Sequence, residues 1–225
     1  MTEVDHRASP PDLRLPFDVD RPTPLRLETG RLVLRPLETS DAADVWEYQR
    51  LPEVLRYIPW PERSREDAWQ HTAKRAGMRR LAEAGDGCIL AMELVGEPSV
   101  GRGEPGGRVT HDGPARNRVI GDIMLRVADV EHAQLEVGWV VHPAFQGRGL
   151  ATEAAEAALG FAFDTLRPHR VLANLDARNA ASAHLCERLG MRHEATILEE
   201  QFNDGAWEDT AIYGILDREW AARLG

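Results

Sequence analysis

The chain has 225 residues, with 27 Lys and Arg against 37 Asp and Glu, so its formal net charge is −10 and its pI is near 5.3. At about 150 residues per domain this is one domain or at most two small ones, and it can bury a core without a disulfide or metal. The acidic balance argues against nucleic acid or an anionic membrane surface as the main partner. It suits an amine substrate, although it can equally serve solubility alone.

Cysteine usage and hydropathy narrow the class of protein further. Cys88 and Cys186 are the only cysteines, and no Cys-x-x-Cys spacing occurs, so we expect neither a disulfide framework nor a metal site. The chain has no signal-type apolar segment and no uncharged apolar run of 18 residues, which predicts a cytoplasmic protein without a membrane anchor.

The first half of the chain begins with a proline-rich leader. Residues 1–24 contain five prolines, which interrupt helices and central strands, so we expect a loose leader that wraps the surface. The elements predicted after it are a strand at 31–36, a helix capped at 39–41 and ending near Gln49, a helical turn at 52–57, a long helix at 65–84, and strands at 87–95 and 118–128. Nine of the 22 residues in 96–117 are Gly or Pro, which indicates a flexible hairpin loop or insertion.

The second half has clearer patterns. The predicted elements are a strand at 135–141, a helix at 148–166 with an apolar stripe, a strand at 170–176, a helix at 180–189, and strands at 192–199 and 206–216. Strands at the start and end with a βαβ unit in the middle predict an α/β or α+β fold on a mixed sheet.

The segment Gln146-Gly-Arg-Gly-Leu-Ala151 lies between a predicted strand end and the helix at 148–166. Its glycines allow close backbone approach, and the first N–H groups of a helix have no intrahelical partner. With Arg148 beside them and no carboxylate before Glu153, these groups form a candidate anion site. Glycines at a strand-to-helix turn can also serve packing alone.

The wider segment Val140-Val-His-Pro-Ala-Phe-Gln-Gly-Arg-Gly-Leu-Ala-Thr-Glu-Ala154 resembles the acyl-CoA pyrophosphate loop, Arg/Gln-x-x-Gly-x-Gly/Ala, of GNAT N-acetyltransferases. Other segments resemble the RimJ/RimL-type branch of that superfamily, in order: Arg31-Leu-Val-Leu-Arg-Pro-Leu, Asp41-Ala-Ala, Tyr57-Ile-Pro-Trp60, Leu135-Glu-Val-Gly-Trp-Val, Asn179-Ala-Ala-Ser182, Glu187-Arg-Leu-Gly-Met191, Asp204-Gly-Ala-Trp207-Glu-Asp209 and Ile212-Tyr213. The resemblance implies a single GNAT domain at 25–220, with the Gly/Pro-rich insertion at 96–117, the leader at 1–24 and a tail at 221–225. It also implies a twisted mixed sheet that is split at the acyl-CoA site and flanked by helices.

The resemblance further implies which residues bind the acyl donor, acetyl-CoA. These are Val140, Val141, His142, Gln146, Gly147, Arg148, Gly149, Leu150, Ala151, Thr152 and Asn179, and no metal is expected. Ser182 matches a serine near the thioester sulfur, although Asn179 and Ser182 also suit a helix N-cap and its third position. Many GNAT enzymes carry a catalytic tyrosine where this chain has Cys186. The apolar surroundings of Cys186 favour a buried structural thiol over a nucleophile.

The implied reaction is transfer of an acetyl group to a primary amine by direct attack in a ternary complex. Glu136 is the candidate base because it shares a strand face with Gly138 and Val140, although a structural carboxylate fits as well. The closing strands offer Glu199 and Glu200 as second candidates. The acceptor pocket expected from the resemblance is lined by Tyr57, Trp60, Glu199, Glu200 and Trp207.

The acceptor is a protein N-terminus or a small-molecule amine, between which the sequence does not choose. The alternatives are an O-acyl or longer-chain acyltransferase with the same donor, and a CoA-binding sensor or partner module without turnover. Acetyl-CoA and the amine are the expected partners. A homodimer is one state that the resemblance allows.

Overall fold

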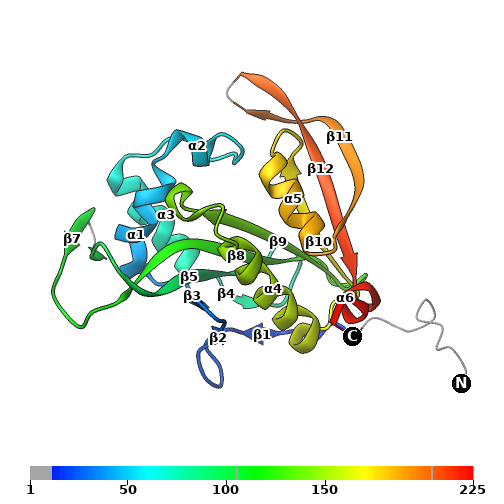
Figure 1. The fold of residues 1–225 in the computed structure, drawn as a ribbon, viewed down its shortest axis with the longest axis horizontal. Coiled ribbons are helices and arrows are strands. Elements are labelled where there is room, and N and C mark those ends of the chain that lie inside the picture. Colours follow the sequence, from blue (N-terminus) through cyan, green and yellow to red (C-terminus); the bar gives the residue numbers. More distant parts are fainter. Residues whose placement is uncertain (1–11, 105, 204, 225) are drawn as a thin grey trace, which may run out of the picture.

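The computed structural model describes residues 12–104, 106–203 and 205–224, in which a mixed sheet of ten strands carries the helices (Figure 1). The strands of the sheet are β1 (Phe17–Asp18), β2 (Leu27–Glu28), β3 (Leu32–Pro36), β4 (Arg79–Leu81), β5 (Gly87–Pro98), β8 (Asn117–Asp129), β9 (Gln134–Val141), β10 (Arg170–Asp176), β11 (Arg192–Asn203) and β12 (Ala206–Leu216). Their order is β1-β4-β5-β8-β9-β10-β12-β11, with β3 joining β2 to β5. The pair β9–β10 is parallel, and the other strand pairs of the sheet are antiparallel.

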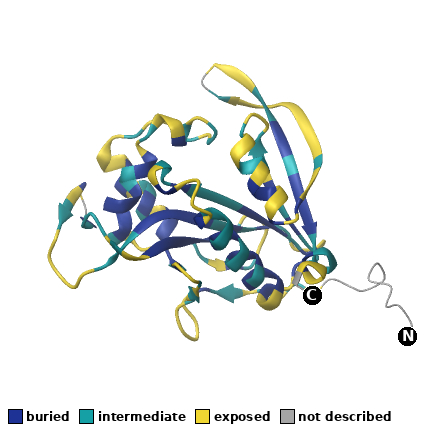
Figure 2. Ribbon diagram, viewed as in Figure 1, coloured by how far each residue is buried: buried dark blue, intermediate teal, exposed yellow. Residues whose placement is uncertain are grey.

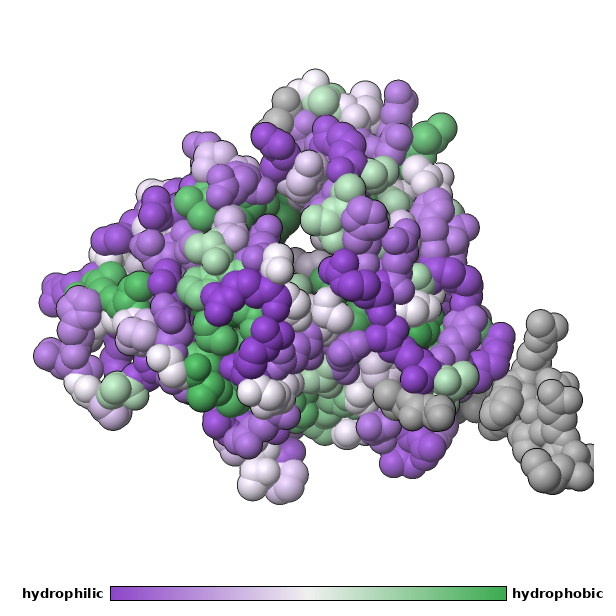
Figure 3. Space-filling view, in the orientation of Figure 1, coloured by the Kyte–Doolittle hydropathy of each residue, from purple (hydrophilic) through white to green (hydrophobic). Residues whose placement is uncertain are grey.

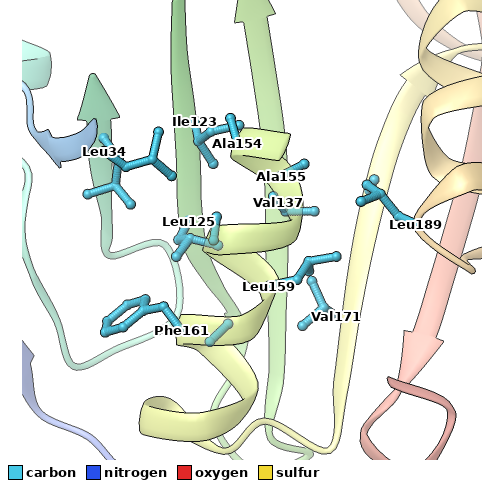
Figure 4. Packing of buried hydrophobic residues seen from close by; sticks show 14 of the residues in the cluster. Leu34, Ile123, Leu125, Val137, Ala154, Ala155, Leu159, Phe161, Val171 and Leu189 are labelled. Atoms are coloured by element: carbon cyan, nitrogen blue, oxygen red, sulfur yellow. The ribbon is translucent and has the colours of Figure 1, made fainter. Parts of the chain in front are cut away.

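Helices cover both faces of this sheet. They are η1 (Thr39–Asp41), α1 (Ala42–Gln49), α2 (Pro52–Leu55), α3 (Arg65–Ala76), η2 (Pro143–Phe145), α4 (Leu150–Phe161), the π-helical turn η3 (Ala162–Leu166), α5 (Ala180–Arg188) and α6 (Asp217–Leu224). The largest core cluster joins α4 and α5 to the sheet, and Figure 4 shows Ala154, Ala155 and Leu159 of α4 against Ile123 and Leu125 of β8. A second cluster joins α1 and α3 to the opposite face of β5 and β8. The predicted mixed sheet with flanking helices is therefore confirmed.

The sheet is split between β9 and β10. These strands pair at three positions only, from Arg170 opposite Gln134 to Leu172 opposite Glu136. Beyond that point β10 continues to pair with β12 as far as Asp176, while β9 continues to pair with β8 as far as Val141. The two halves of the sheet therefore diverge towards the C-terminal ends of β9 and β10, where α4 and α5 begin.

The segment after α3 differs from its prediction. The helix expected at 65–84 ends at Ala76, with Gly77 as its C-cap, and Arg79–Leu81 instead forms β4 between β1 and β5. Charged residues continue the helical pattern beyond Gly77, but the pairing of β4 with the distant β1 and with the following strand β5 overrides that local pattern.

Both ends of the described chain are tied to the domain more closely than expected. Residues 1–11 of the predicted leader lie outside the described residues, but Phe17–Asp18 pairs with β4 and Val19 is buried in the core. The tail expected at 221–225 forms part of α6 as far as Leu224, whereas Gly225 is not described. Trp220 of α6 stacks on Phe163, with 5.8 Å between ring centroids.

The Gly/Pro-rich segment is a packed hairpin and not a free loop. Its strands β6 (Arg102–Glu104) and β7 (Arg108–Thr110) pair with each other, and its ends extend β5 and β8. The Val100 N–H donates to Asp44 Oδ1 at 2.8 Å, and a Cβ added to Gly103 would lie 2.5 Å from Ala42 Cβ. The expected hairpin loop or insertion is thus a hairpin, of which Val100 and Gly103 contact α1.

No helix within the described residues is long and apolar enough to cross a bilayer.

Candidate active site

The glycine-rich turn that follows β9 forms a cradle of backbone N–H groups at the start of α4. Gly147 and Gly149 adopt positive φ angles of 71° and 76°, and Gly149 is the N-cap of the helix. A Cβ at Gly147 would meet nothing within 4 Å, so the space beside it is open. The Gln146 side chain donates to Val141 O at 3.0 Å and holds the turn against the strand end. The first N–H groups of α4, from Leu150 onwards, consequently face this space without intrahelical acceptors.

The charges around this cradle favour an anion. The guanidinium groups of Arg118 and Arg148 both lie over the Phe145 ring, at 5.4 and 5.6 Å from its centroid. Neither arginine pairs with a carboxylate of the described chain. Arg118 Nε is buried and has no hydrogen-bond partner in the described structure.

The only carboxylate in the first turn of α4 is turned away from the cradle. Glu153 accepts hydrogen bonds from Thr29 Oγ1 at 2.6 Å and from Arg31 Nε at 2.7 Å. Burial opposes ionisation of Glu153, but these hydrogen bonds and the Arg31 charge outweigh it and lower the pKa of the carboxyl. The cradle thus combines free N–H donors with unpaired cations, which fits the pyrophosphate of a CoA molecule.

The start of α5 lies across the split from β9. Asn179 Oδ1 accepts from the Ser182 N–H at 3.0 Å, so Asn179 is the N-cap of α5. The Ser182 hydroxyl oxygen accepts from Trp139 Nε1 at 3.1 Å, which links β9 to α5 beyond the last β9–β10 pair. Cys186 is fully buried one turn further along, and burial raises the pKa of its thiol to about 12. The thiol is therefore protonated at neutral pH, as the expected structural role requires.

A cavity of about 370 Å³ lies on the sheet face opposite α4 and α5. Six of its lining residues alternate along the strands with residues of the α4–α5 core, and they are Arg126, Glu136, Arg170, Leu172, Asn174 and Ile212. The others are Gly85, Val127, Ala128 and Glu200. The cavity spans the point where β9 and β10 part, because Leu172 and Glu136 form their last pair. It brings together two of the predicted carboxylates, Glu136 from β9 and Glu200 from β11.

The two carboxylates differ in their surroundings. Glu136 is 8% exposed and accepts hydrogen bonds from Arg126 through Nε, at 3.1 Å, and through Nη2. Glu200 is exposed and pairs with no cation of the described chain. Glu199 lies in the bulge of β11 with a φ of 51°, and its N–H donates to Asp209 Oδ1. The structure therefore gives Glu136 a structural ion pair and leaves Glu200 as the unengaged carboxylate of the cavity.

The predicted aromatic residues do not line this cavity. The ring centroids of Trp60 and His71 lie 5.1 Å apart, and the guanidinium groups of Arg75 and Arg63 lie over the Trp60 ring. Tyr57 is half-buried in the turn after α2. Trp207 is 59% exposed and packs on Phe202 near the tip of the β11–β12 hairpin. Figure 3 shows the surface hollowed between the side that carries α2 and the side that carries this hairpin.

A buried group of charges behind Trp60 was missed by sequence reasoning. Arg75 of α3 donates to both carboxylate oxygens of Asp122, and the Tyr48 hydroxyl donates to Asp122 Oδ2 at 2.7 Å. Asp122 stands opposite Val140 in the β8–β9 ladder, so this group supports the face of β9 that borders the split. The available signal was Asp122 as the only charged residue of the segment 119–125. It did not identify Arg75 or Tyr48 as its partners.

His71 belongs to the same side of the site. Burial lowers its pKa, and the charges of Arg63 and Arg75 lower it further, to about 4. The imidazole is therefore neutral at pH 7.

No group of three or more His, Cys, Asp or Glu side chains placed to hold a metal occurs within residues 12–104, 106–203 and 205–224.

Comparisons with known proteins agree on the family. The model of the acetyltransferase (GNAT) domain matches residues 31–192. The uncharacterized N-acetyltransferase YnaD of Bacillus subtilis is 30% identical over 196 residues, which cover 87% of this chain and 99% of that protein. A GNAT-family acetyltransferase structure from Bacillus anthracis superposes with a TM-score of 0.69 and 27% identity, over 86% of this chain and 99% of the other.

A spermidine N-acetyltransferase from Vibrio cholerae, solved in complex with CoA and spermine, shares the fold with a TM-score of 0.65. Its sequence identity is 19%, over 86% of this chain and 99% of that one. The matched domain, the split sheet and the N–H cradle together show that this chain is an N-acetyltransferase and belongs to the GNAT family, among its RimJ/RimL-like members.

Proposed function

We propose that this protein transfers an acetyl group from acetyl-CoA to the primary amine of a small molecule or a protein N-terminus, by direct attack in a ternary complex. The observation that carries the proposal is the split between β9 and β10, which opens towards the N–H cradle on one face and the Glu136–Glu200 cavity on the other. A donor and an acceptor can thus reach one point from opposite sides of the sheet.

The donor side uses the cradle and the free edge of β9. The N–H groups of Gly147, Gly149 and the first turn of α4 bind the pyrophosphate, and Arg148 adds a positive charge. Beyond Glu136 the edge of β9 has no partner on β10, so its backbone groups are free to pair with the amides of pantetheine. The other donor-binding residues are Val140, Val141, His142, Gln146, Leu150, Ala151, Thr152 and Asn179. Acetyl-CoA supplies the activated acetyl thioester.

The acceptor side must bind the amine and remove its proton. An amine of the lysine type has a pKa near ~10.4 and an α-amino group one near ~7.7–8.0, so only the former needs strong help at neutral pH. We assign the proton-accepting role to Glu200 because Arg126 engages the Glu136 carboxylate. Glu136 then orients Arg126 and the floor of the cavity.

The chemistry at sulfur needs little assistance. As the C–N bond forms and the C–S bond breaks, the electron pair passes to sulfur, and a thiol with a pKa near ~8.5 is a fair leaving group. The Ser182 hydroxyl donates a hydrogen bond to the departing sulfur, and the amine proton leaves through Glu200 to solvent. Positioning of the two substrates supplies most of the rate.

The test is turnover with a panel of amines. Purified protein is incubated with acetyl-CoA and peptides with free N-termini, polyamines, aminoglycosides or amino acids, and CoA thiol release is followed together with the product mass. We expect thiol release and an acetylated amine for at least one class, and polyamines belong in the panel because the Vibrio cholerae structure contains spermine. Acetyl-CoA binding without turnover across the panel would instead favour a sensor. Acetylation of hydroxyls, or turnover only with longer acyl-CoA, would favour the other transferase reactions.

A pair of variants tests the choice of base. Glu200→Gln should lower kcat/KM for the amine about a hundredfold, at the low end of the range for general base catalysis, with the KM for acetyl-CoA unchanged. Glu136→Gln should chiefly lower stability because it leaves Arg126 without its partner. A reversal, in which Glu136→Gln abolishes turnover of a stable protein and Glu200→Gln does not, would return the role to Glu136.

A further inference from the structure

The hydrogen bond between Trp139 and Ser182 crosses the split of the sheet where the sulfur of the donor is expected. Trp139 is three residues beyond the last β9–β10 pair, and Ser182 is in the first turn of α5. The indole Nε1 lies 3.1 Å from the Ser182 hydroxyl oxygen. An indole N–H can only donate, so the hydroxyl must accept this bond.

This direction constrains the hydroxyl proton. A serine hydroxyl has one O–H donor and two lone pairs, and here one lone pair is taken by the indole. The Ser182 O–H therefore points away from Trp139. The Asn179 side chain accepts from the Ser182 backbone N–H and holds the residue in place. Trp139 is itself held by its partial burial against the α4–α5 core.

We infer that Trp139 is a positioning residue, which orients the Ser182 hydroxyl so that its proton is directed at the departing sulfur. The inference rests on the proposed function, because it needs Ser182 to donate to that sulfur. The hydroxyl accepts from the indole and donates to the sulfur at the same time, so the Trp139–Ser182 bond is kept during the reaction. A donor bond to the hydroxyl oxygen also polarises its O–H, which strengthens the bond that it donates.

A double-mutant cycle separates orientation from packing. Trp139→Phe keeps an aromatic ring against the core but removes the N–H donor together with part of the ring volume, while Ser182→Ala removes the hydroxyl. We expect kcat with acetyl-CoA to fall about tenfold in Ser182→Ala and about three- to fivefold in Trp139→Phe, as for one modest hydrogen bond and part of one. The KM for acetyl-CoA should hardly change. In the Ser182→Ala background, Trp139→Phe should cost nothing further.

Trp220 provides the matched control. Its indole is also buried, but its Nε1 has no hydrogen-bond partner in the described structure. Trp220→Phe therefore removes an aromatic N–H from the same core without removing a hydrogen bond. Its kcat should equal that of the wild type.

The selenoester analogue of acetyl-CoA tests the role at sulfur separately, because a loss of kcat caused by altered packing would be the same with either donor. A selenol is more acidic than a thiol and needs less stabilisation as it leaves, so both Trp139→Phe and Ser182→Ala should approach the wild-type kcat with this donor. The inference would be overturned if Trp139→Phe lowered kcat by the same factor in the wild type and in the Ser182→Ala variant. It would also be overturned if Trp139→Phe lowered kcat as much with the selenoester as with acetyl-CoA. Normal kcat in Ser182→Ala would overturn it together with the role of Ser182. Absence of turnover by the wild type would instead contradict the proposed function.

Discussion

The two sides of the split sheet are built in different ways. The cradle of the donor side is made from consecutive residues, because the end of β9, the turn with Gly147 and Gly149, and the first turn of α4 follow each other in the chain. The acceptor side is assembled from β8, β9, β10, β11 and β12, and it depends on side chains such as Arg126 and Glu200. Backbone N–H groups survive most substitutions, whereas a side-chain lining changes with each one. A fold of this kind can therefore keep its donor while its acceptor varies.

The largest predicted effect breaks the donor side alone. Gly149→Asp should raise the Kd for acetyl-CoA at least a hundredfold, or about 2.7 kcal/mol, in calorimetry. Asp tolerates the left-handed backbone of Gly149, and at this N-cap its carboxylate would accept the N–H bonds intended for phosphate. Gly106→Asp is the control, since Gly106 also has a positive φ and an open surrounding but lies on the β6–β7 hairpin. Normal acetyl-CoA binding by folded Gly149→Asp would refute the cradle assignment.

The next effect lies outside both sides of the split and tests how firmly the β6–β7 hairpin packs on α1. Gly103→Ala should lower the free energy of unfolding by about 1–3 kcal/mol, since its Cβ would lie 2.5 Å from Ala42 Cβ and 3.0 Å from the Ala43 backbone nitrogen. Gly160→Ala in α4 meets nothing within 4 Å and should be neutral or stabilising by up to about 1 kcal/mol. Urea titrations measure both. Equal stability of the two variants would show that the β6–β7 hairpin is not packed on α1.

A pH-dependent effect is expected from His71, beside Trp60. Its pKa is lowered to about 4 in the folded protein from 6.5, so the unfolded chain binds more protons between these values. Stability should therefore fall as pH drops from about 6.5 to about 4. Because His71 is only partly buried, we expect a loss of about 1–2 kcal/mol, less than the full linkage value.

Thermal unfolding at pH 7 and pH 5 compares the wild type with His71→Gln, in which this part of the pH dependence should disappear. The control is His132→Gln, since His132 is exposed and Asp129 raises its pKa, which gives a contribution of the opposite sign. If stability changes between pH 7 and pH 5 as much in His71→Gln as in the wild type, the imidazole of His71 is solvated in the folded protein.

The smallest effect concerns Cys186, on the donor side. Cys186→Ser should leave kcat within about twofold of the wild type, because a buried neutral thiol is no nucleophile. Steady-state kinetics, corrected for the folded fraction, provide the measurement. An acetylated Cys186 peptide in mass spectrometry of the protein after incubation with acetyl-CoA would contradict direct attack.

Local patterns predicted the elements that carry the proposed donor site. The strand at 170–176 has the predicted limits, and the helix predicted at 148–166 corresponds to α4 followed by the π-helical turn. These elements depend on apolar periodicity and on glycines in a short segment, both of which are visible without tertiary information. The same holds for Asn179, whose capping bond to Ser182 joins residues three apart.

Features that depend on strand register could not be predicted in this way. The pair Arg126–Glu136 exists because these residues stand opposite each other in the β8–β9 ladder, and Asp122 meets Arg75 only after α3 packs on β8. Trp207, expected in the acceptor pocket, does not line the Glu136–Glu200 cavity, because it lies near the end of the β11–β12 hairpin, where residues are exposed (Figure 2). Pairing between distant segments decides each of these positions, and a single sequence does not reveal it.

The brief contact between β9 and β10 has a consequence for the lifetime of the protein in the cell. Three residue pairs form the seam between the two halves of the sheet, so the opening of this seam exposes backbone that proteases can cut. A donor that lies along the free edge of β9 would act as the missing strand and close the seam. Because a ligand stabilises the state that binds it in proportion to the logarithm of its concentration, the resistance of this enzyme to degradation should rise and fall with the acetyl-CoA supply.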